Sequence, residues 1–413
     1  MLTLACPQRR ELAQSPEEVA ASLRHLPGFV WLDTAGRCPE PDRDGAISIL
    51  AACPHSILRG DIRDPYPLDA ALAALQTPVT DVDWGVPLSG LIGSVDYDGS
   101  YCFGVYPQLV IYRHQSGDWF ETGDLLSMAR ATSVPAAQRL EFAPEISLDQ
   151  WRQMVEKAHH YIAAGDIYQV NLSHRFRAAW PENGDPFALY SRLREANPAP
   201  HGAYLTLGGR RLLSSSPESF LRMSGRGIRT RPIKGTRPRF PDAVADERSR
   251  RDLITSPKER AELVMITDLL RNDLGMVCEY GSIQVTGLLQ PETYEHIHHL
   301  VSTVQGVLRP DISHAAALSA CFPGGSITGA PKKRACEIIR ELEPCCRGLY
   351  TGAIGILGAN QESHFSIAIR TVIQENGEAI FHAGAGIVAD SAADAEWDET
   401  LHKAAGILSA ATG

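Results

Sequence analysis

Short apolar blocks, separated by turn-forming residues, run through the first 130 residues. Three of them read GFVWLDTAG (28–36), LSGLIGSVDYDG (88–99) and YPQLVIYRH (106–114). Apolar runs of this length, broken by proline, glycine or aspartate, are typical of β-strands and turns. We therefore predict that residues 1–130 form a mostly β N-terminal region.

The pattern changes after residues 131–148, which show no clear period and are expected to connect two regions. Residues 149–164 have helical spacing, and residues 167–177 and 203–207 have the pattern of strands. A chain of 413 residues exceeds the size at which one simple core stops growing, so two domains or one large domain are expected. We predict that the second region, residues 148–407, has an α+β fold.

A helix with clear capping signals is predicted at residues 256–275. Ser256 suits the N-cap, Pro257 the first turn and Gly275 the C-terminal cap, and Glu259 would complete a capping box. These signals fix the helical phase.

This phase places a carboxylate among apolar side chains. Glu262, Met265, Ile266, Leu269 and Leu270 follow the spacing of one helix face. A buried carboxylate needs a partner. Two explanations are open at this point: Glu262 pairs with an arginine in the core, or it belongs to a functional site.

A second helical segment, residues 393–403, carries two more carboxylates. Glu396, Glu399 and Lys403 share one face at spacings of three and four. Such a face is often simply solvated. Oxygen ligands without a nearby histidine or cysteine cluster would otherwise suit Mg²⁺.

A glycine-rich loop at residues 322–334 is predicted to lead into a helix that runs through Glu343. Pro331 suits the first turn of this helix. Backbone N–H groups at a helix N-terminus attract anions, and Ser326 and Thr328 would add donors. The spacing differs from that of nucleotide phosphate loops, so a carboxylate is the expected ligand, although glycine loops before helices are common.

Two further segments extend this picture. The run FHAGAGIV (381–388) allows close backbone approach to a ligand. Residues 366–371 alternate like a strand and carry Arg370, whose planar guanidinium suits a carboxylate. The sequence of the second region therefore predicts a Mg²⁺-dependent site that binds a small polycarboxylate.

Composition narrows the class of protein. Hydrophobic residues make up 44% and charged residues 21%, no apolar run approaches the ~18 residues of a membrane span, and no export signal is evident. The net charge of −10 gives no overall attraction for nucleic acid, although residues 229–239 are densely basic. The nine cysteines lack any CxxC pair, which predicts reduced thiols in a cytoplasmic protein without a nucleic-acid or membrane partner.

A series of motifs between about residues 150 and 405 resembles, in the same order, the chorismate-utilising enzymes. This family includes anthranilate, aminodeoxychorismate, isochorismate and salicylate synthases. The motifs are IYQVNLSHRF, SSSPESF, TRPIKGTRPR, PKERAELVMITDLLRNDLG, HIHHLVSTVQG, FPGGSITGAPK, YTGAIG, FSIAIRT and GAGIVADSAADAEWDETLHKA. The resemblance implies an anthranilate-synthase-like fold in which two facing β-sheets, covered by helices, enclose the active site.

Within the family, the PIKGT form resembles the aminodeoxychorismate synthases, because anthranilate synthases typically carry alanine in place of this lysine. The resemblance implies that Lys234 adds to ring carbon C2 and that Glu218 protonates the hydroxyl leaving C4. Burial should then raise the pKa of Glu218. The four arginines of residues 229–239 would favour neutral Lys234 if they point inward; a basic surface loop is the alternative.

The same resemblance implies a metal site and a set of substrate contacts. The Mg²⁺ ligands would be Glu262, Glu396 and Glu399. The substrate contacts would be Arg370, Lys403 and the backbone near Gly386 for carboxylate, His299 and Thr328 beside the ring, and Gln169, which replaces the water-activating lysine of isochorismate and salicylate synthases. Gln169 cannot act as that base, which favours ammonia as the nucleophile.

No glutaminase motif is evident in the chain, so a separate glutamine amidotransferase subunit is expected to supply ammonia. Chorismate would then be converted toward 4-aminobenzoate and folate. Anthranilate synthase component I, which eliminates pyruvate, is the alternative, and a non-catalytic chorismate-binding regulator is a third hypothesis. FVWLD is only a distant counterpart of the inhibitor motif of anthranilate synthases, so tryptophan feedback is not expected.

Overall fold

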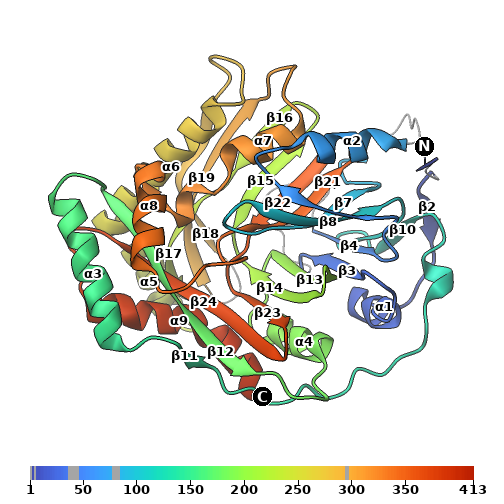
Figure 1. The fold of residues 1–413 in the computed structure, drawn as a ribbon, viewed down its shortest axis with the longest axis horizontal. Coiled ribbons are helices and arrows are strands. Elements are labelled where there is room, and N and C mark those ends of the chain that lie inside the picture. Colours follow the sequence, from blue (N-terminus) through green and yellow to red (C-terminus); the bar gives the residue numbers. More distant parts are fainter. Residues whose placement is uncertain (1, 4–5, 36–45, 77–83, 294–296) are drawn as a thin grey trace.

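Two large antiparallel β-sheets face each other, and helices cover their outer surfaces (Figure 1). This computed structural model describes residues 2–3, 6–35, 46–76, 84–293 and 297–413. The arrangement confirms the predicted α+β fold with two facing sheets.

The larger sheet contains twelve strands. Its order is β11 (Ala143–Pro144), β12 (Gln169–Ala179), β24 (Glu378–Ile387), β23 (Thr371–Glu375), β14 (Arg210–Ser216), β13 (His201–Leu207), β3 (Val30–Asp33), β4 (Ile47–Ala51), β9 (Leu109–Arg113), β10 (Asp118–Thr122) and β2 (Gln8–Arg10), with β20 (Gly329–Ala330) paired to β12.

The smaller sheet contains ten strands. Its order is β17 (Ile233–Pro238), β19 (Ile297–Val307), β16 (Gly227–Thr230), β15 (Ser219–Ser224), β22 (Glu362–Ile367), β21 (Ala353–Gly358), β7 (Gly90–Val95), β8 (Ser100–Tyr106) and β5 (Ile57–Asp61), with β18 (Gln284–Thr293) paired to β19. A short parallel pair joins β1 (Leu2–Thr3) to β6 (Leu75–Gln76).

The helices of the described chain are α1 (Pro16–Leu23), α2 (Tyr66–Ala74), α3 (Leu148–Ala163), α4 (Pro186–Ala196), α5 (Ala243–Thr255), α6 (Pro257–Gly275), α7 (His314–Cys321), α8 (Lys332–Leu342) and α9 (Ala393–Thr412), with 3₁₀ turns η1 (Leu126–Met128) and η2 (Gly325–Ile327). Helices α1, α4 and α9 pack on the larger sheet, and α2, α7 and the end of α6 on the smaller one. Within the described ranges, none of the helices is both long and apolar enough to cross a membrane.

Strand β3 shows how the pattern of the sequence builds these layers. Val30 packs between the sheets with Leu205 and Ile354, whereas Trp31 faces outward and stacks on Phe187 of α4 at a centroid distance of 6.1 Å. Both residues are fully buried. Because successive side chains of a strand point to opposite faces, a strand covered on both faces is apolar throughout.

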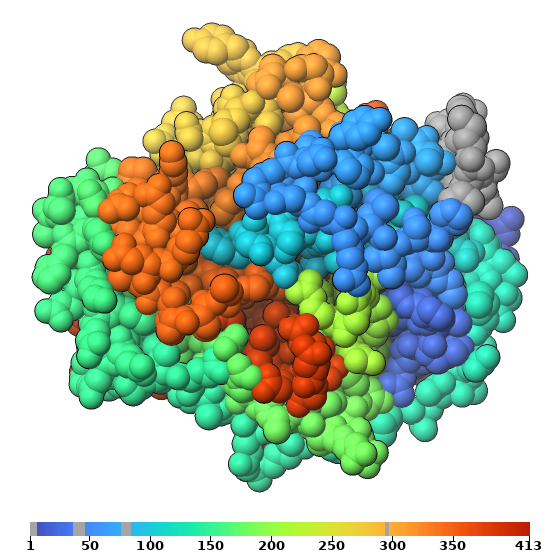
Figure 2. Space-filling view, in the orientation of Figure 1, coloured from blue at the N-terminus to red at the C-terminus, as the bar shows by residue number. Residues whose placement is uncertain are grey.

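Strands of the N-terminal region continue both sheets. Strand β3 pairs with β13 in the larger sheet, and β7 pairs with β21 in the smaller one. Figure 2 shows the blue and cyan N-terminal segments lying directly against segments from later in the chain. Residues 129–142 contain no helix or strand and lead to β11. The division into regions 1–130 and 148–407 stays a prediction.

The observed elements confirm several local predictions and correct others. The predicted helix at 149–164 is α3, and the predicted strands at 167–177 and 203–207 are β12 and β13. Ser256 caps α6 by accepting from the Glu259 backbone N–H at 3.4 Å. The predicted capping box is only half formed, because the Glu259 side chain accepts from Arg237 instead. Gly275 is the last residue of the helix, and Met276 is its C-cap.

The predicted strand at residues 366–371 is wrong. Strand β22 ends at Ile367, and β23 begins at Thr371 in the other sheet. Arg370 lies between them with a φ of +49°. The chain crosses from one sheet to the other here, which period-two alternation cannot reveal.

The eight described cysteines form no disulfide, in agreement with the predicted reduced thiols, and Cys38 lies outside the described residues.

Candidate active site

A cavity of about 480 Å³ is lined by residues of both sheets and of α6 and α9. Most of the residues predicted for the site line it. They are Glu218, Lys234, Glu262, His299, Arg370, Gly386, Glu399 and Lys403. The fold thus gathers residues that are far apart in sequence, and it does so between the two sheets as the resemblance implied.

Lys234 lies on β17, the edge strand of the smaller sheet. The register with β19 shifts between Lys234 and Thr236, and Gly235 has a φ of +70°. Such a bulge bends the strand and re-aims neighbouring side chains, and glycine adopts this φ without strain. Nδ1 of His299 on β19 lies 3.3 Å from the Gly235 carbonyl oxygen and 3.1 Å from the Thr236 hydroxyl. The bulge therefore places Lys234 beside His299.

His299 is electrically neutral at physiological pH, because burial lowers its pKa to about 4. A neutral imidazole can border a substrate ring without adding charge beside Lys234.

Of the arginines of residues 229–239, Arg237 lines the same cavity as Lys234. Three of them are paired with carboxylates. The pairs are Arg231 with Glu292, Arg237 with Glu259 and Arg239 with Asp246. Opposite charge reaches Lys234 instead from Glu218, Glu262 and Glu399, each of whose pKa it helps to lower against burial. The sequence left inward arginines and a basic surface loop both open, because charge in the sequence does not show where each arginine finds its partner.

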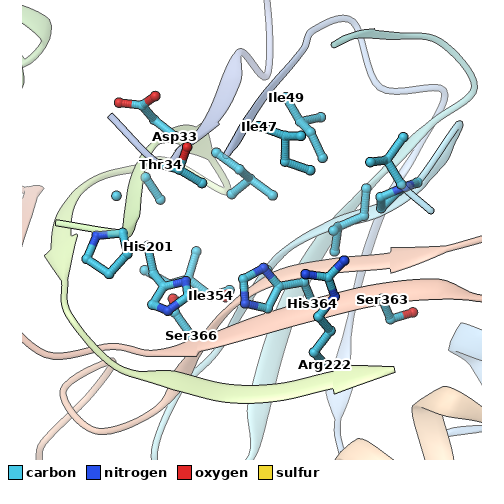
Figure 3. Close-up of a pocket in the computed structure, with 18 of the residues that line it drawn as sticks. Asp33, Thr34, Ile47, Ile49, His201, Arg222, Ile354, Ser363, His364 and Ser366 are labelled. Carbon is cyan, nitrogen blue, oxygen red and sulfur yellow. Dashed lines mark hydrogen bonds between the residues drawn. The ribbon is translucent and has the colours of Figure 1, made fainter. Parts of the chain in front are cut away.

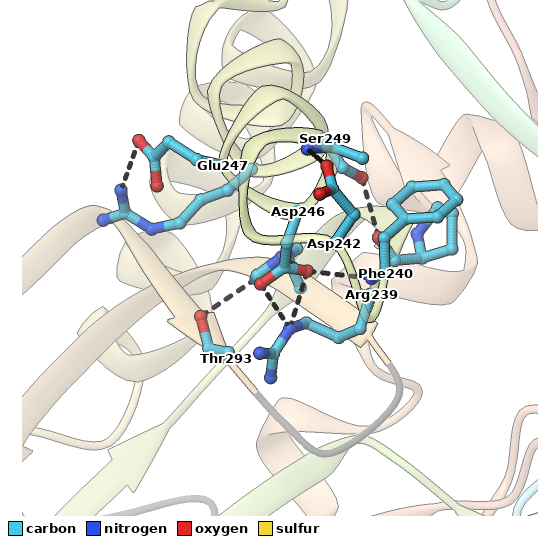
Figure 4. A network of polar contacts seen from close by, with 11 residues as sticks. Arg239, Phe240, Asp242, Asp246, Glu247, Ser249 and Thr293 are labelled. Atoms are coloured by element: carbon cyan, nitrogen blue, oxygen red, sulfur yellow. Dashed lines mark hydrogen bonds and ion pairs between the residues drawn. The ribbon is translucent and has the colours of Figure 1, made fainter.

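Asp246 anchors the strand that carries Lys234 (Figure 4). Its carboxylate accepts from Arg239 Nε at 2.8 and 2.9 Å and from the Phe240 backbone N–H at 3.0 Å, and it lies 3.1 Å from His298 Nε2. The Arg239 hydrogen bond, with that of Phe240, holds the pKa of Asp246 well below its usual range. The contacts tie the first turn of α5 to both β17 and β19.

Glu218 lies where the chain crosses from β14 to β15, from the larger sheet to the smaller. Its side chain is buried, and burial raises the pKa of the carboxyl, against a hydrogen bond from Ser326 and the charges of Lys234 and Lys403. The direction agrees with the prediction. A carboxyl that holds its proton longer is suited to act as a general acid.

Arg370 occupies the second crossing between the sheets, from β22 to β23. Its carbonyl oxygen accepts from the Ser215 backbone N–H at 3.0 Å, so this crossing and that of Glu218 lie side by side. A positive φ is costly for a residue with a side chain and persists only where surrounding contacts enforce it. Burial lowers the pKa of the Arg370 guanidinium, which remains a cation. The strained backbone holds a bidentate donor at the cavity wall.

A lysine and a carboxylate of α9 meet at another part of the cavity wall. Nζ of Lys403 lies 2.6 Å from Glu399 Oε1 and donates to the Gly384 carbonyl oxygen at 2.9 Å. Burial alone would raise the pKa of Glu399, but Lys403, with Lys234 and Lys258, lowers it. The wall therefore combines a cation, an anion and the small residues of β24.

The three carboxylates proposed as metal ligands do not all face the cavity. Glu262 and Glu399 line it, whereas Glu396 is buried behind it and accepts from Ser391 Oγ at 2.7 Å. In the described ranges, no three His, Cys, Asp or Glu side chains gather closely enough to hold a metal ion. Carboxylate oxygens are nevertheless the ligands that Mg²⁺ prefers. In this structure the ammonium of Lys258 lies next to these carboxylates, with Nζ 3.7 Å from Glu396 Oε1.

Thr328 does not line the cavity. It is fully buried, and its hydroxyl donates to the carbonyl oxygens of Gly324 and Gly325 at 3.1 and 3.3 Å. The neighbouring Ser326 and Ile327 face the cavity instead. Thr328 therefore shapes the glycine-rich loop that presents them.

Gln169 also lies outside the cavity wall, behind Gly386. A Cβ atom on Gly386 would come within 2.3 Å of Gln169 Nε2. The side chain is buried, and its Oε1 has no hydrogen-bond partner among the described residues. The glutamine thus fills the space that Gly386 leaves open.

Sequence reasoning missed several lining residues. Tyr350, Asn171 and His382 line the cavity, and Lys258 lines it beside Glu262. The i, i+4 spacing of Lys258 and Glu262 on one predicted helix could have revealed that pair. The other three gave no comparable signal, because their proximity depends on the pairing of β12 with β24 and on the turn before β21.

A second, smaller cavity of about 100 Å³ also lies between the sheets (Figure 3). Asp33 and Ile49 of the larger sheet face Ile354 and His364 of the smaller one. No residue predicted for the site lines it, and it lacks the lysine and acid pair of the larger cavity. The larger cavity is therefore the candidate active site.

Comparisons with known proteins identify the family of the chain. The sequence profile of the family described as chorismate binding enzyme matches residues 98–409. Aminodeoxychorismate synthase component 1 of Bacillus subtilis (strain 168) is 41% identical over 96% of this chain and 94% of its own length. Anthranilate synthase component 1 of Streptomyces coelicolor is 47% identical, but over 63% of this chain and 51% of its own length.

A solved structure gives the same result for the fold. The crystal structure of anthranilate synthase component I from Streptococcus pneumoniae TIGR4 superimposes with a TM-score of 0.76 at 32% identity, covering 89% of this chain and 93% of that one.

Proposed function

Because the chain belongs to the family of chorismate binding enzymes, we propose that it replaces the ring hydroxyl of chorismate with ammonia and forms 4-amino-4-deoxychorismate. The product would lead to 4-aminobenzoate and folate. The observation that carries the proposal is that Lys234 and Glu218 share one cavity between the sheets, together with cationic groups suited to carboxylates. An amine nucleophile and a protonated acid are the two groups that this substitution requires.

The reaction proceeds in two displacements. The neutral amine of Lys234 bonds to ring carbon C2, both ring double bonds shift toward C4, and the C4–O bond breaks. Glu218 gives its proton to the departing oxygen, which leaves as water. Ammonia then bonds to C4, both double bonds shift back, and the C2–N bond to Lys234 breaks, which releases the neutral amine. The new ammonium at C4 returns one proton to Glu218, so chorismate and ammonia have become the amino product and water.

The substrate's carboxylates define its orientation. Arg370 offers a bidentate pair of N–H donors, and Lys403 and the backbone near Gly386 offer donors on the facing wall. His299 borders the ring as a neutral group. Thr328 acts through the loop that it stabilises, and Gln169 acts through Gly386, so neither contacts substrate directly.

Mg²⁺, when bound, would neutralise a substrate carboxylate, and Glu262 and Glu399 with Glu396 are the residues that would hold it. The metal would add positive charge to that of Arg370 and Lys403, and together these groups would balance the two carboxylates of the substrate.

Ammonia is the proposed nucleophile, and a glutamine amidotransferase subunit is its proposed source. Gln169 lacks a basic nitrogen that could activate water. The names of the Bacillus and Streptomyces relatives, each a component 1, support a second component.

Anthranilate formation is the second candidate, favoured by the 47% identity to the Streptomyces anthranilate synthase component over 63% of the chain. That reaction eliminates pyruvate and needs no lysine nucleophile. The near full-length match to the Bacillus relative and the position of Lys234 favour amination without elimination.

Product analysis tests the proposal. The purified chain is incubated with chorismate, Mg²⁺ and ammonium salt, with and without an aminodeoxychorismate lyase, and products are identified by mass and fluorescence. 4-Aminobenzoate that forms only with the lyase supports the proposal. Anthranilate formed without the lyase would establish the second candidate instead.

The covalent role has its own test. Lys234→Ala should lose amination with ammonium salt, whereas Lys157→Ala, at an exposed position of α3, should retain it. Full activity of Lys234→Ala would refute the lysine adduct.

A further inference from the structure

Lys258 lies among the carboxylates proposed to hold the metal. It occupies the first turn of α6, four residues before Glu262, and lines the cavity. Its Nζ is 3.7 Å from Oε1 of Glu396. The Lys258 side chain is 55% exposed, whereas that of Glu396 is 5% exposed. A half-exposed cation therefore lies against a buried anion.

The charges around Lys258 show what this cation does. Burial acts to lower its pKa, but the carboxylates of Glu396, Glu262, Glu399 and Glu259 together raise it. Lys258 thus lies in the field of four carboxylates, and Glu396 is the one within ion-pair distance.

The neighbouring cations Lys403 and Arg237 pair with two of these carboxylates, Glu399 and Glu259. Lys403 pairs with Glu399 at 2.6 Å and donates to a carbonyl oxygen of β24. Arg237 contacts Glu259 at 3.4 Å. Lys258 is the cation that the described chain brings to Glu396, whose buried charge would otherwise be costly.

We propose that Lys258 is an internal counter-ion that occupies the place of the divalent cation in the metal-free enzyme and must withdraw when Mg²⁺ binds. The inference rests on the magnesium part of the proposed function. Its long, half-exposed side chain can swing into solvent without disturbing α6. Lys258 therefore stabilises the empty carboxylate site and at the same time weakens its affinity for the metal.

Two effects of opposite sign follow when the charge is removed. Lys258→Met leaves the buried Glu396 carboxylate without its cation, so the metal-free protein loses stability. The same change removes a competitor, so Mg²⁺ binds more tightly. An exposed ion pair changes an equilibrium constant by up to about five-fold, which sets the expected gain in affinity at about five-fold. A lysine that merely supports the helix would lower stability equally with and without metal.

The experiment uses the full chain without substrate. Mg²⁺ is titrated calorimetrically into metal-free wild type, Lys258→Met and Lys258→Arg, and the Tm of each is measured in EDTA and in saturating MgCl₂. Lys258→Met should bind Mg²⁺ about five-fold more tightly, and its lower Tm in EDTA should recover in MgCl₂. Lys258→Arg should stay within about two-fold of wild type, and Lys157→Met, which removes a distant exposed charge, should change neither quantity.

The outcomes separate this inference from the proposed function. Affinity that is unchanged or weaker in Lys258→Met, or a Tm deficit that persists in MgCl₂, would overturn the inference even if the enzyme aminates chorismate. Tighter binding without amination would sustain the inference and refute the function. A wild-type protein that does not bind Mg²⁺ would refute both the counter-ion role and the magnesium site.

Discussion

A buried ion pair beneath the active site is expected to carry much of the stability of the fold. Arg347 and Glu343 are joined twice, at 2.7 Å from Nη2 to Oε1 and at 2.9 Å from Nε to Oε2. Their side chains are 1% and 4% exposed. Arg347 also donates to the carbonyl oxygens of Ile327 and Asn171 and to the Thr351 hydroxyl at 3.2, 2.6 and 3.0 Å. The pair therefore fixes two residues of the cavity wall.

The cost of Arg347→Met follows from these contacts. Breaking a buried pair from one side leaves an uncompensated charge, here the Glu343 carboxylate, at about 3–5 kcal/mol. Ser173 still donates to this carboxylate through its N–H and hydroxyl, at 2.8 and 2.9 Å, which places the cost within rather than above that range. Because three acceptors also lose a donor, the cost lies at the upper end of that range. We expect a loss of about 5 kcal/mol, a large share of the roughly 5–15 kcal/mol of a typical domain.

Urea unfolding followed by tryptophan fluorescence measures this loss as a change in the free energy of unfolding. The double variant Arg347→Met/Glu343→Leu removes both charges, so it should cost at least about 2 kcal/mol less than the sum of the two single changes. Arg152→Met is the matched control, because Arg152 makes the same contact with Asp394 at 2.7 Å but on the surface, where such pairs contribute about 1 kcal/mol or less. A cost below about 1.5 kcal/mol for Arg347→Met, or additive single changes, would refute the reasoning.

Three further changes test the site. Glu218→Gln should lower kcat by about 10²–10⁴-fold. Burial raises the pKa of Glu218, so its contribution to stability is present below the unfolded pKa of ~4.3 and is lost as pH rises through the folded pKa. Glu218→Gln should therefore have a higher Tm than wild type at pH 8 but not at pH 4. Arg239 and Phe240 lower the pKa of Asp246, so its contribution to stability is present above the unfolded value of ~3.9 and is lost as pH falls toward the folded one. Thermal melts should show Asp246→Asn less stable than wild type at pH 7, with a smaller difference in Tm near pH 2. Gly386→Ala should raise the chorismate KM about ten-fold, since its new Cβ would lie 2.3 Å from Gln169 Nε2, and Gln169→Ala in the same chain should restore much of it in steady-state assays.

Local signals of the sequence predicted the helices that carry the carboxylates. Ser256 and Pro257 mark the start of α6, and the spacing of Glu396, Glu399 and Lys403 gives one face of α9. These signals are readable because capping and helical periodicity depend on residues within a few positions of one another. The motifs likewise predicted eight of the residues that line the cavity.

Contacts between distant segments decided the rest. Arg370 crosses between the sheets with a positive φ instead of continuing a strand, and the arginines around Lys234 find carboxylates elsewhere in the chain. Thr328, Gln169 and Glu396 lie one layer behind the cavity wall.

The sequence by itself determined the periodicity, the caps and the kinds of chemical group available to the site. The tertiary structure alone decided which of these groups face one another. Strand pairing joins residues far apart in the chain, and burial and charge pairing set the protonation of each group only after that pairing exists.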